Sequence, residues 1–408
     1  MAGMNSNVAA AALRSDVRVI SLIGFAHGTS HFFQLVLPPL FPWLMPEFGL
    51  SFTQVGAVMT TLFVVSAIGQ AMAGFLVDRF GPQRVLLAGI GCFVLAALLL
   101  ALANSYAVLF LVGILIGLGN CVFHPADFTV LNRDVSPARL SYAFSAHGLS
   151  GNLGYALAPV MMAGIATAAG WRTAALCAVA LGVTAWLAIR MQPGAARPEA
   201  AGAKPEPGKK ASAFGFLGVG AVWMCFAFFL LVTAAFAGLQ NYATPIMQQL
   251  YGLSAASAAA TLTALLLGGA GGIAVGGVYA SRNPSHDRLI ALVIGLAALI
   301  AVLIASAVLP VWSVSIAMAA MGFCVGLAGP SRDLLVRQAA TSRFGQQAYG
   351  RVYGFVYSGL DAGAALSPLA FGPLMDAGHF GGAMIGVAVL QGAAILTVLR
   401  IGRLRPAD

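Results

Sequence analysis

Charged side chains are scarce in this sequence. Only 8% of its 408 residues are Asp, Glu, Lys or Arg, whereas 60% are hydrophobic. Soluble domains carry roughly 25% charged residues, so this composition excludes an ordinary water-soluble fold and places the chain in lipid. A bilayer core of about 30 Å needs roughly 20 apolar residues per helix, which leaves room for about twelve spans.

Cysteine is also sparse, and none of its spacings forms a CxxC pair. The five cysteines all fall inside apolar segments, which argues against a disulfide framework or a thiolate metal site and favours packing roles. A nucleotide-binding loop is lacking too. The glycine-rich run at 268–277 has no Gly-Lys-Ser/Thr ending, so we interpret it as a helix-packing surface and expect an ion gradient, not ATP, as the energy source.

The apolar segments are long and continuous, without the two-residue alternation of a membrane barrel. They predict an all-α membrane protein with a retained first helix and no cleaved signal peptide. The expected spans are residues 18–44, 53–77, 85–103, 106–131, 141–168, 172–191, 214–240, 255–281, 288–308, 311–335, 350–376 and 380–400.

Basic residues are distributed unevenly along this predicted topology. Twenty of the 21 Lys and Arg residues fall on one face when both termini share it, and Arg172 is the exception. Lys and Arg in short loops stay on the cytoplasmic side, so we expect a multi-pass inner-membrane protein with both termini in the cytoplasm. The net charge of +9 therefore reflects topology, and we expect no nucleic-acid partner.

One polar stretch, residues 193–212, is rich in Pro, Ala, Gly and Lys. This composition predicts a flexible cytoplasmic linker. It divides the chain into a six-helix bundle at 1–192 and a second at 213–408. The two halves share a sequence pattern: Leu157-Ala158-Pro159 and Leu366-Ser367-Pro368 each follow a glycine at the same distance. Internal duplication predicts two halves related by a pseudo-twofold axis.

A loop motif follows the second span of the first half. It runs Gly74-x-x-x-Asp78-Arg79-x-Gly81-x-x-Arg84, and it resembles the loop signature of the major facilitator superfamily. Phe123-His124-Pro125, together with a glycine-rich fifth span, is similar to the fosmidomycin-resistance and related permease branch. The resemblance covers the whole chain.

The resemblance implies a twelve-helix transporter that works by alternating access. It places the first, fourth, seventh and tenth helices around a central cavity, with the fifth and eleventh at its sides. It also implies gating roles for five residues of the loop motif and its counterpart in the second half. These residues are Asp78, Arg79, Gly81, Arg84 and Arg282.

Polar residues inside spans are expensive in lipid and commonly mark a substrate or ion pathway. His27 and His31 share one face of the first helix, and His124 and Asp127 share one face of the fourth. A lone histidine can equally serve by donating one hydrogen bond to a carbonyl, and both readings stay open. The candidates for substrate binding are His27, His31, Gln34, His124, Asp127, His147, Asn152, Gln240, Asn241 and Arg332.

Four positions carry further expectations: Asp361, and His31, His124 and Arg332 from among the substrate-binding candidates. Asp361 lies near the middle of the eleventh span, where a desolvated carboxylate can bind and release a proton in each cycle, although it could instead make a helix-helix hydrogen bond. His31 and His124 are the alternative proton carriers. Arg332 either extends to water or provides a fixed cation for an anionic substrate.

Together these features predict a secondary active transporter of a small polar organic solute, coupled to protons. The alternatives are antibiotic efflux by proton antiport, transport of a metal or metal chelate, and an intramembrane enzyme that uses His124 and Asp127 as an acid-base pair. We expect no enzyme activity, no cofactor and no resident metal. The expected partners are the small-molecule substrate, protons and the lipid bilayer, with the chain acting as a monomer.

Overall fold

The computed structural model describes residues 2–191, 218–280, 286–344 and 349–403. These parts contain fourteen α-helices and two short 3-10 helices. The predicted linker at 193–212 and the predicted gating residue Arg282 lie outside the described residues. The elements are α1 (Ala2–Gln34), η1 (Pro38–Leu40), α2 (Phe41–Phe48), α3 (Phe52–Phe80), α4 (Pro82–Ala101), α5 (Tyr106–Asn120), α6 (Phe123–Asp134), η2 (Pro137–Arg139), α7 (Leu140–Ala169), α8 (Trp171–Arg190), α9 (Gly220–Tyr251), α10 (Ala255–Ala280), α11 (His286–Ala305), α12 (Val311–Phe344), α13 (Tyr349–Asp376) and α14 (Phe380–Arg403).

These helices form the membrane fold that the sequence predicts. Among the described residues, ten helical segments are long and apolar enough to cross a membrane, counting α5 and α6 as one. The bent pair of α1 and α2 adds an eleventh, and α13, with 28 residues, completes twelve. The prediction of an all-α membrane protein is confirmed, and the helices are consistent with the twelve predicted spans.

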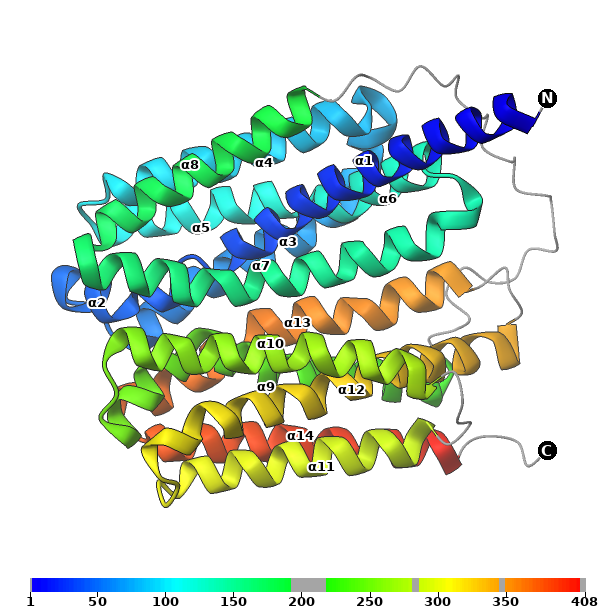
Figure 1. The fold of residues 1–408 in the computed structure, drawn as a ribbon. Helices are drawn as coiled ribbons and strands as arrows, with labels where there is room; N and C mark the ends of the chain where they lie inside the picture. Colours follow the sequence, from blue (N-terminus) through cyan, green and yellow to red (C-terminus); the bar gives the residue numbers. More distant parts are fainter. Residues whose placement is uncertain (1, 192–217, 281–285, 345–348, 404–408) are drawn as a thin grey trace.

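The packing of the second half repeats that of the first. In the first half α1 packs on α7, α3 on α5, and α4 on α8; in the second, α9 packs on α13, α10 on α12, and α11 on α14. Each pair joins the same positions in the order of spans. Figure 1 shows the two bundles side by side, with α1 beginning and α14 ending at the same end of the molecule. The predicted pseudo-symmetry is therefore confirmed.

Proline interrupts two of the predicted spans. The first was expected to continue to residue 44, but α1 ends at Gln34 and the chain bends by 42° before α2. Pro38 and Pro39 lack the amide hydrogen that a continuous helix needs there. The fourth span breaks between Asn120 and Phe123, because Pro125 cannot donate to the carbonyl of Cys121.

The seventh span is longer than predicted. We expected it to end at Gln240 and Asn241, but α9 continues to Tyr251 and both residues lie in its interior. The buried stripe of α9 continues through Tyr242, Ile246 and Met247, so the polar pair interrupts the apolar sequence without ending the helix.

The described hydrogen bonds between the two halves lie in the part of the molecule opposite the start of α1. At that face α3 begins and α13 ends. Asp376 of α13 accepts hydrogen bonds there from the backbone N–H groups of Phe52 and Thr53. Tyr242 donates to the carbonyl of Phe52. Two further bonds run from Thr60 to Ala365 and from Thr263 to Ala156, each 2.8 Å long. The halves are thus joined at the face opposite the start of α1.

Glycines allow α10 and α12 to approach at backbone distance. A Cβ added at Gly322 would fall on the carbonyl oxygen of Leu265, and one added at Gly268 would fall on that of Ala319. Gly277, in contrast, faces open space. The predicted packing role of the 268–277 run is therefore confirmed for Gly268 but not for Gly277.

Gly322→Ala is expected to destabilise the second half by about 1–3 kcal/mol, because the new methyl group meets backbone that cannot rotate away. Thermal unfolding of the protein in detergent would measure the loss as a lower midpoint. Gly277→Ala is the matched control and should leave the midpoint unchanged. Equal midpoints for both variants would contradict the close approach of α10 and α12.

Candidate functional site

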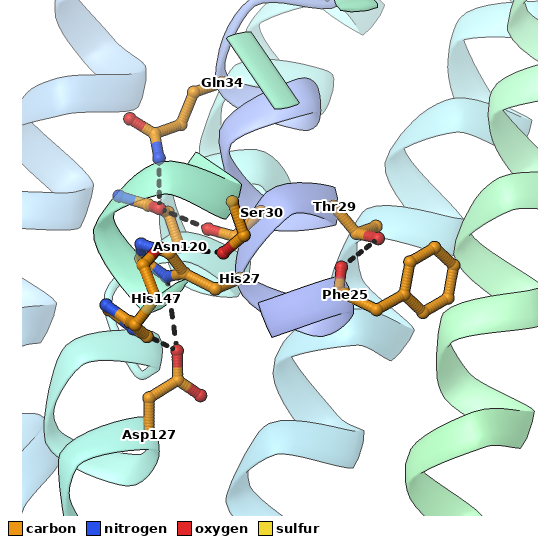
Figure 2. A network of polar contacts seen from close by, with 9 residues as sticks. Phe25, His27, Thr29, Ser30, Gln34, Asn120, Asp127 and His147 are labelled. Carbon is orange, nitrogen blue, oxygen red and sulfur yellow. Dashed lines mark hydrogen bonds and ion pairs between the residues drawn. The ribbon is translucent and has the colours of Figure 1, made fainter. Parts of the chain in front are cut away.

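Four histidines and one aspartate gather between α1, α6 and α7. Asp127 is fully buried, and its Oδ2 lies 3.0 Å from Nε2 of His147 and 3.2 Å from Nδ1 of His27. Figure 2 shows these two imidazoles on the same side of the carboxylate. We call His27, His31, His124, His147 and Asp127 the histidine cluster. Three helices converge on this one buried carboxyl group: α1 from the start of the chain, and the consecutive helices α6 and α7.

The imidazole rings of the cluster touch one another. His27 stacks on His147 with 3.5 Å between ring centroids, and it lies 4.5 Å from His31 and 5.3 Å from His124. Gly151 of α7 makes this possible, because a Cβ there would lie 2.8 Å from Cε1 of His31. Helix geometry brings together the members of the cluster that share a helix, since residues three or four apart lie on the same helix face.

His124 and Asp127, the acid-base pair of one alternative read from the sequence, both lie in the histidine cluster. Asp127 hydrogen-bonds His147 on α7 and also lies against His27 on α1, and no described hydrogen bond joins it to His124. The two residues share a face of α6, but α1 and α7 bring the closer partners.

A second polar group continues from the cluster toward the face where α3 begins. Asn120, at the end of α5, is its centre: its Oδ1 accepts from Gln34 at 2.7 Å and from Ser30 at 2.8 Å, and its Nδ2 donates to Ser66. The hydroxyl of Tyr155 donates to Oε1 of Gln34. Figure 2 shows Gln34 and Ser30 converging on Asn120.

Sequence reasoning missed Asn120, Ser30, Ser66 and Tyr155. The spacing of residues along a helix could have indicated two of them. Ser30 lies one turn from His27, and Asn120 is four residues before His124. Ser66 and Tyr155 come from other helices, and only the packing reveals them.

Tyr155 lies in the first half, in the neighbourhood of Asp361 of α13 in the second. Its ring lies 4.3 Å from that of His31. Asp361 is half-buried, and no hydrogen bond or ion pair reaches it within the described part of the chain. We call the series from the histidine cluster through Asn120, Gln34 and Tyr155 to Asp361 the polar column.

The other predicted binding residues lie outside this column. Asn152 donates to the carbonyl of Gly148 on its own helix, and Asn241 does the same to Ala237. Gln240 is buried in α9. The guanidinium of Arg332 lies 4.5 Å from the ring centroid of Phe229, which is a cation-π contact inside the second half.

The predicted gating motif forms the turn between α3 and α4. Gly81 has a φ of +82°, which a residue with a side chain rarely adopts. Asp78 and Arg84 are exposed, and the guanidinium of Arg79 lies 5.2 Å from the ring centroid of Phe80. Asp78 makes no ion pair with any residue that the structure describes.

A separate pocket of about 390 Å³ lies between α1, α7 and α8. Its lining is mostly apolar and includes Gly24, Gly28, Ser150 and Leu181. None of the histidines lines it. The histidine cluster and this pocket are therefore separate features of the first half.

Comparisons with known proteins agree with this architecture. Residues 22–368 match the family model described as Major Facilitator Superfamily. The Fosmidomycin resistance protein of Escherichia coli (strain K12) is 29% identical over 65% of this chain and 65% of its own length. The Probable nitrate/nitrite transporter NarK2 of Mycobacterium tuberculosis is 26% identical over 84% of this chain and 85% of its own. The resemblance read from the sequence motifs is confirmed.

The fold is also similar to that of solved transporters. A bacterial homolog to human lysosomal transporter Spinster, in an inward-facing and occupied conformation, superposes with a TM-score of 0.73 over 95% of this chain and 96% of that one. The two are 15% identical, so the likeness concerns the fold alone. Among the curated relatives, the alignments cover 65% of the fosmidomycin resistance protein and 35% of the uncharacterized MFS-type transporter YfnC of Bacillus subtilis, less than two thirds of each.

Asn120→Ala is expected to destabilise the first half by about 1–3 kcal/mol, because it leaves Gln34 and Ser66 without their buried partner. The measurement is the thermal unfolding midpoint in detergent. Asn152→Ala provides the control, since Asn152 bonds only its own helix and its loss should be nearly neutral. A midpoint as high for Asn120→Ala as for this control would show that the network adds no stability.

Proposed function

The chain belongs to the major facilitator superfamily, and from this premise we propose that it is a secondary active transporter of a small polar organic solute, driven by protons. The polar column carries the proposal. It contains titratable side chains in both halves, the histidines of the cluster in the first and Asp361 in the second. Polar residues at membrane depth commonly mark such pathways.

Alternating access requires the two halves to separate at one face and then at the other. The described hydrogen bonds between halves, at Asp376, Tyr242, Thr60 and Thr263, favour a conformation closed at the face where α3 begins. In the opposite state these bonds break, and the loop from Asp78 to Arg84 approaches the second half. The positive-inside rule makes the face of the termini cytoplasmic in our proposal, in a cell inner membrane.

We propose that the substrate binds at the part of the polar column that faces the second half. His31, Gln34 and Tyr155 offer imidazole, amide and hydroxyl groups there. Imidazoles bind a polar solute by hydrogen bonding when neutral and attract an anion when protonated. His27, His124 and His147 lie behind them and would adjust the charge of the site.

A second candidate function is export of an antibiotic-like compound. The 29% identity to the fosmidomycin resistance protein favours it, as does the 29% identity to the Multidrug resistance protein B homolog of Mycobacterium tuberculosis over 34% of this chain. A thermal-shift screen of polar metabolites and antibiotics, fosmidomycin included, would separate these candidates on the purified protein.

Asp361→Asn is expected to abolish accumulation of the solute under a pH gradient while leaving exchange across the membrane intact. The amide keeps the shape of the side chain but cannot carry a proton. Proteoliposomes with an internal pH dye and the solute from the screen provide both readouts. Asp376→Asn, on the same helix but at the closed face, should stay coupled.

Accumulation by the Asp361→Asn protein would transfer the coupling role to His31 or His124, and their Gln variants are tested in the same assay. If all three variants still accumulate the solute, proton coupling through the polar column is wrong.

Asp78→Asn is expected to lower turnover by at least about fivefold with a smaller change in substrate affinity, because the loop biases a conformational equilibrium and does not contact the solute. Initial rates across a range of solute concentrations separate the two effects. Asp134→Asn removes a carboxylate from the same face, outside the motif, and should transport normally. Unchanged turnover at equal protein density would remove Asp78 from the gate.

A further inference from the structure

The histidine cluster contains more unpaired polar atoms than proton transfer requires. Within the described residues, Nδ1 of His27, His31 and His124 and Oδ1 of Asp127 are buried without a hydrogen-bond partner. The Nδ1 of His27 lies 3.2 Å from Asp127, but not in hydrogen-bond geometry. Buried polar atoms normally have hydrogen-bond partners, so several buried polar atoms without partners in one place indicate a bound ligand.

Three histidines of the cluster place one ring nitrogen each close enough together to hold a metal ion. His27, His124 and His147 each offer one ring nitrogen, and the three nitrogens lie within 4.8 Å of one another. Asp127 Oδ2 lies 3.0 Å and 3.2 Å from two of the rings. Metal-ligand bonds of about 2.0–2.2 Å place neighbouring ligand atoms roughly 3 Å apart, so the Asp127 contacts match the edges of a coordination polyhedron.

Charge and donor type favour a divalent ion of the later transition metals. The cluster supplies imidazole nitrogen and carboxylate oxygen, a set that suits cobalt, nickel or zinc better than the oxygen-seeking magnesium or calcium. Among the described residues, the ion-pair contacts of Asp127 are to His147 and His27. A dication would compensate the buried carboxylate at this place.

His124 is the most exposed of the four proposed ligands. It is half-buried, and its ring stacks against the exposed Phe128 with 5.8 Å between centroids. His27, His147 and Asp127 are buried. We therefore expect an ion to enter past His124.

We infer that His27, His124, His147 and Asp127 bind one divalent transition-metal ion inside the first half of the bundle. This site goes beyond the proposed transport of an organic solute and does not depend on it, because binding is measurable without transport. It also explains why two imidazole rings lie against one buried carboxylate, when a single partner would suffice for a proton.

Cobalt is the probe for the test, because Co²⁺ bound by nitrogen and oxygen ligands absorbs visible light. The full chain is purified with an affinity tag that contains no histidine, stripped with EDTA and titrated with Co²⁺. The expected result is saturable absorption with one ion per chain. Asp127→Asn and His147→Gln should weaken binding by about tenfold or more. His379→Gln removes an exposed histidine outside the cluster and should bind like the unaltered chain.

A buried substitution can impair folding, so a second variant keeps the test decisive. His124→Gln alters the half-buried ligand, and its elution from size exclusion should match that of the unaltered protein. Its unfolding midpoint without metal should stay the same, while the rise produced by Co²⁺ should shrink. The metal site is overturned if the unaltered chain shows no saturable binding of Co²⁺. It is also overturned if folded His124→Gln and Asp127→Asn proteins bind Co²⁺ as tightly as the unaltered chain.

The transport assay distinguishes failure of this inference from failure of the proposed function. Proton-coupled solute uptake is measured with EDTA present, where no transition metal is available. Uptake in EDTA by a chain that binds no Co²⁺ refutes the metal site and leaves the transporter. One Co²⁺ per chain together with no uptake of any screened solute supports the metal site and refutes the organic-solute transporter.

Discussion

A carboxylate inside a hydrocarbon layer must find its partners within the protein, and Asp127 finds them in His147 and His27. An unpaired ion there would cost several kcal/mol. This requirement draws α1, α6 and α7 together around one oxygen atom. Gly151 and Gly154 permit the approach, because a Cβ at either position would collide with α1. Much of the first half is arranged around this contact.

The contact between the halves depends on a different interaction. Asp376 of α13 accepts from the first two amide groups of α3, so a carboxylate of the second half satisfies the free N-terminal donors of a helix in the first. This cap lies at the face of the membrane, where water can replace it. A bond that water can replace suits a gate that has to open, whereas the dry contacts of α10 with α12 suit a unit that moves as one body.

The polar column connects these two regions. The histidine cluster lies in the first half, with Tyr155 beside it, and Asp361 lies on the helix that also carries Asp376. In the proposed transport cycle, a change of charge at either end would favour one conformation of the gate over the other. Coupling of this kind needs only that the two conformations differ in how well they stabilise that charge.

The sequence by itself determined the class of fold, the number of spans and most of their ends, because burial in lipid requires long apolar helices and leaves few alternatives. It also marked the expensive residues, including all four histidines of the cluster. Only the tertiary structure decided which of them meet. Asn152 and Gln240 looked equivalent to Gln34 in the sequence, yet Gln34 alone joins the column. Contacts between distant helices depend on rotation and on proline breaks such as that before Pro125, which local spacing does not specify.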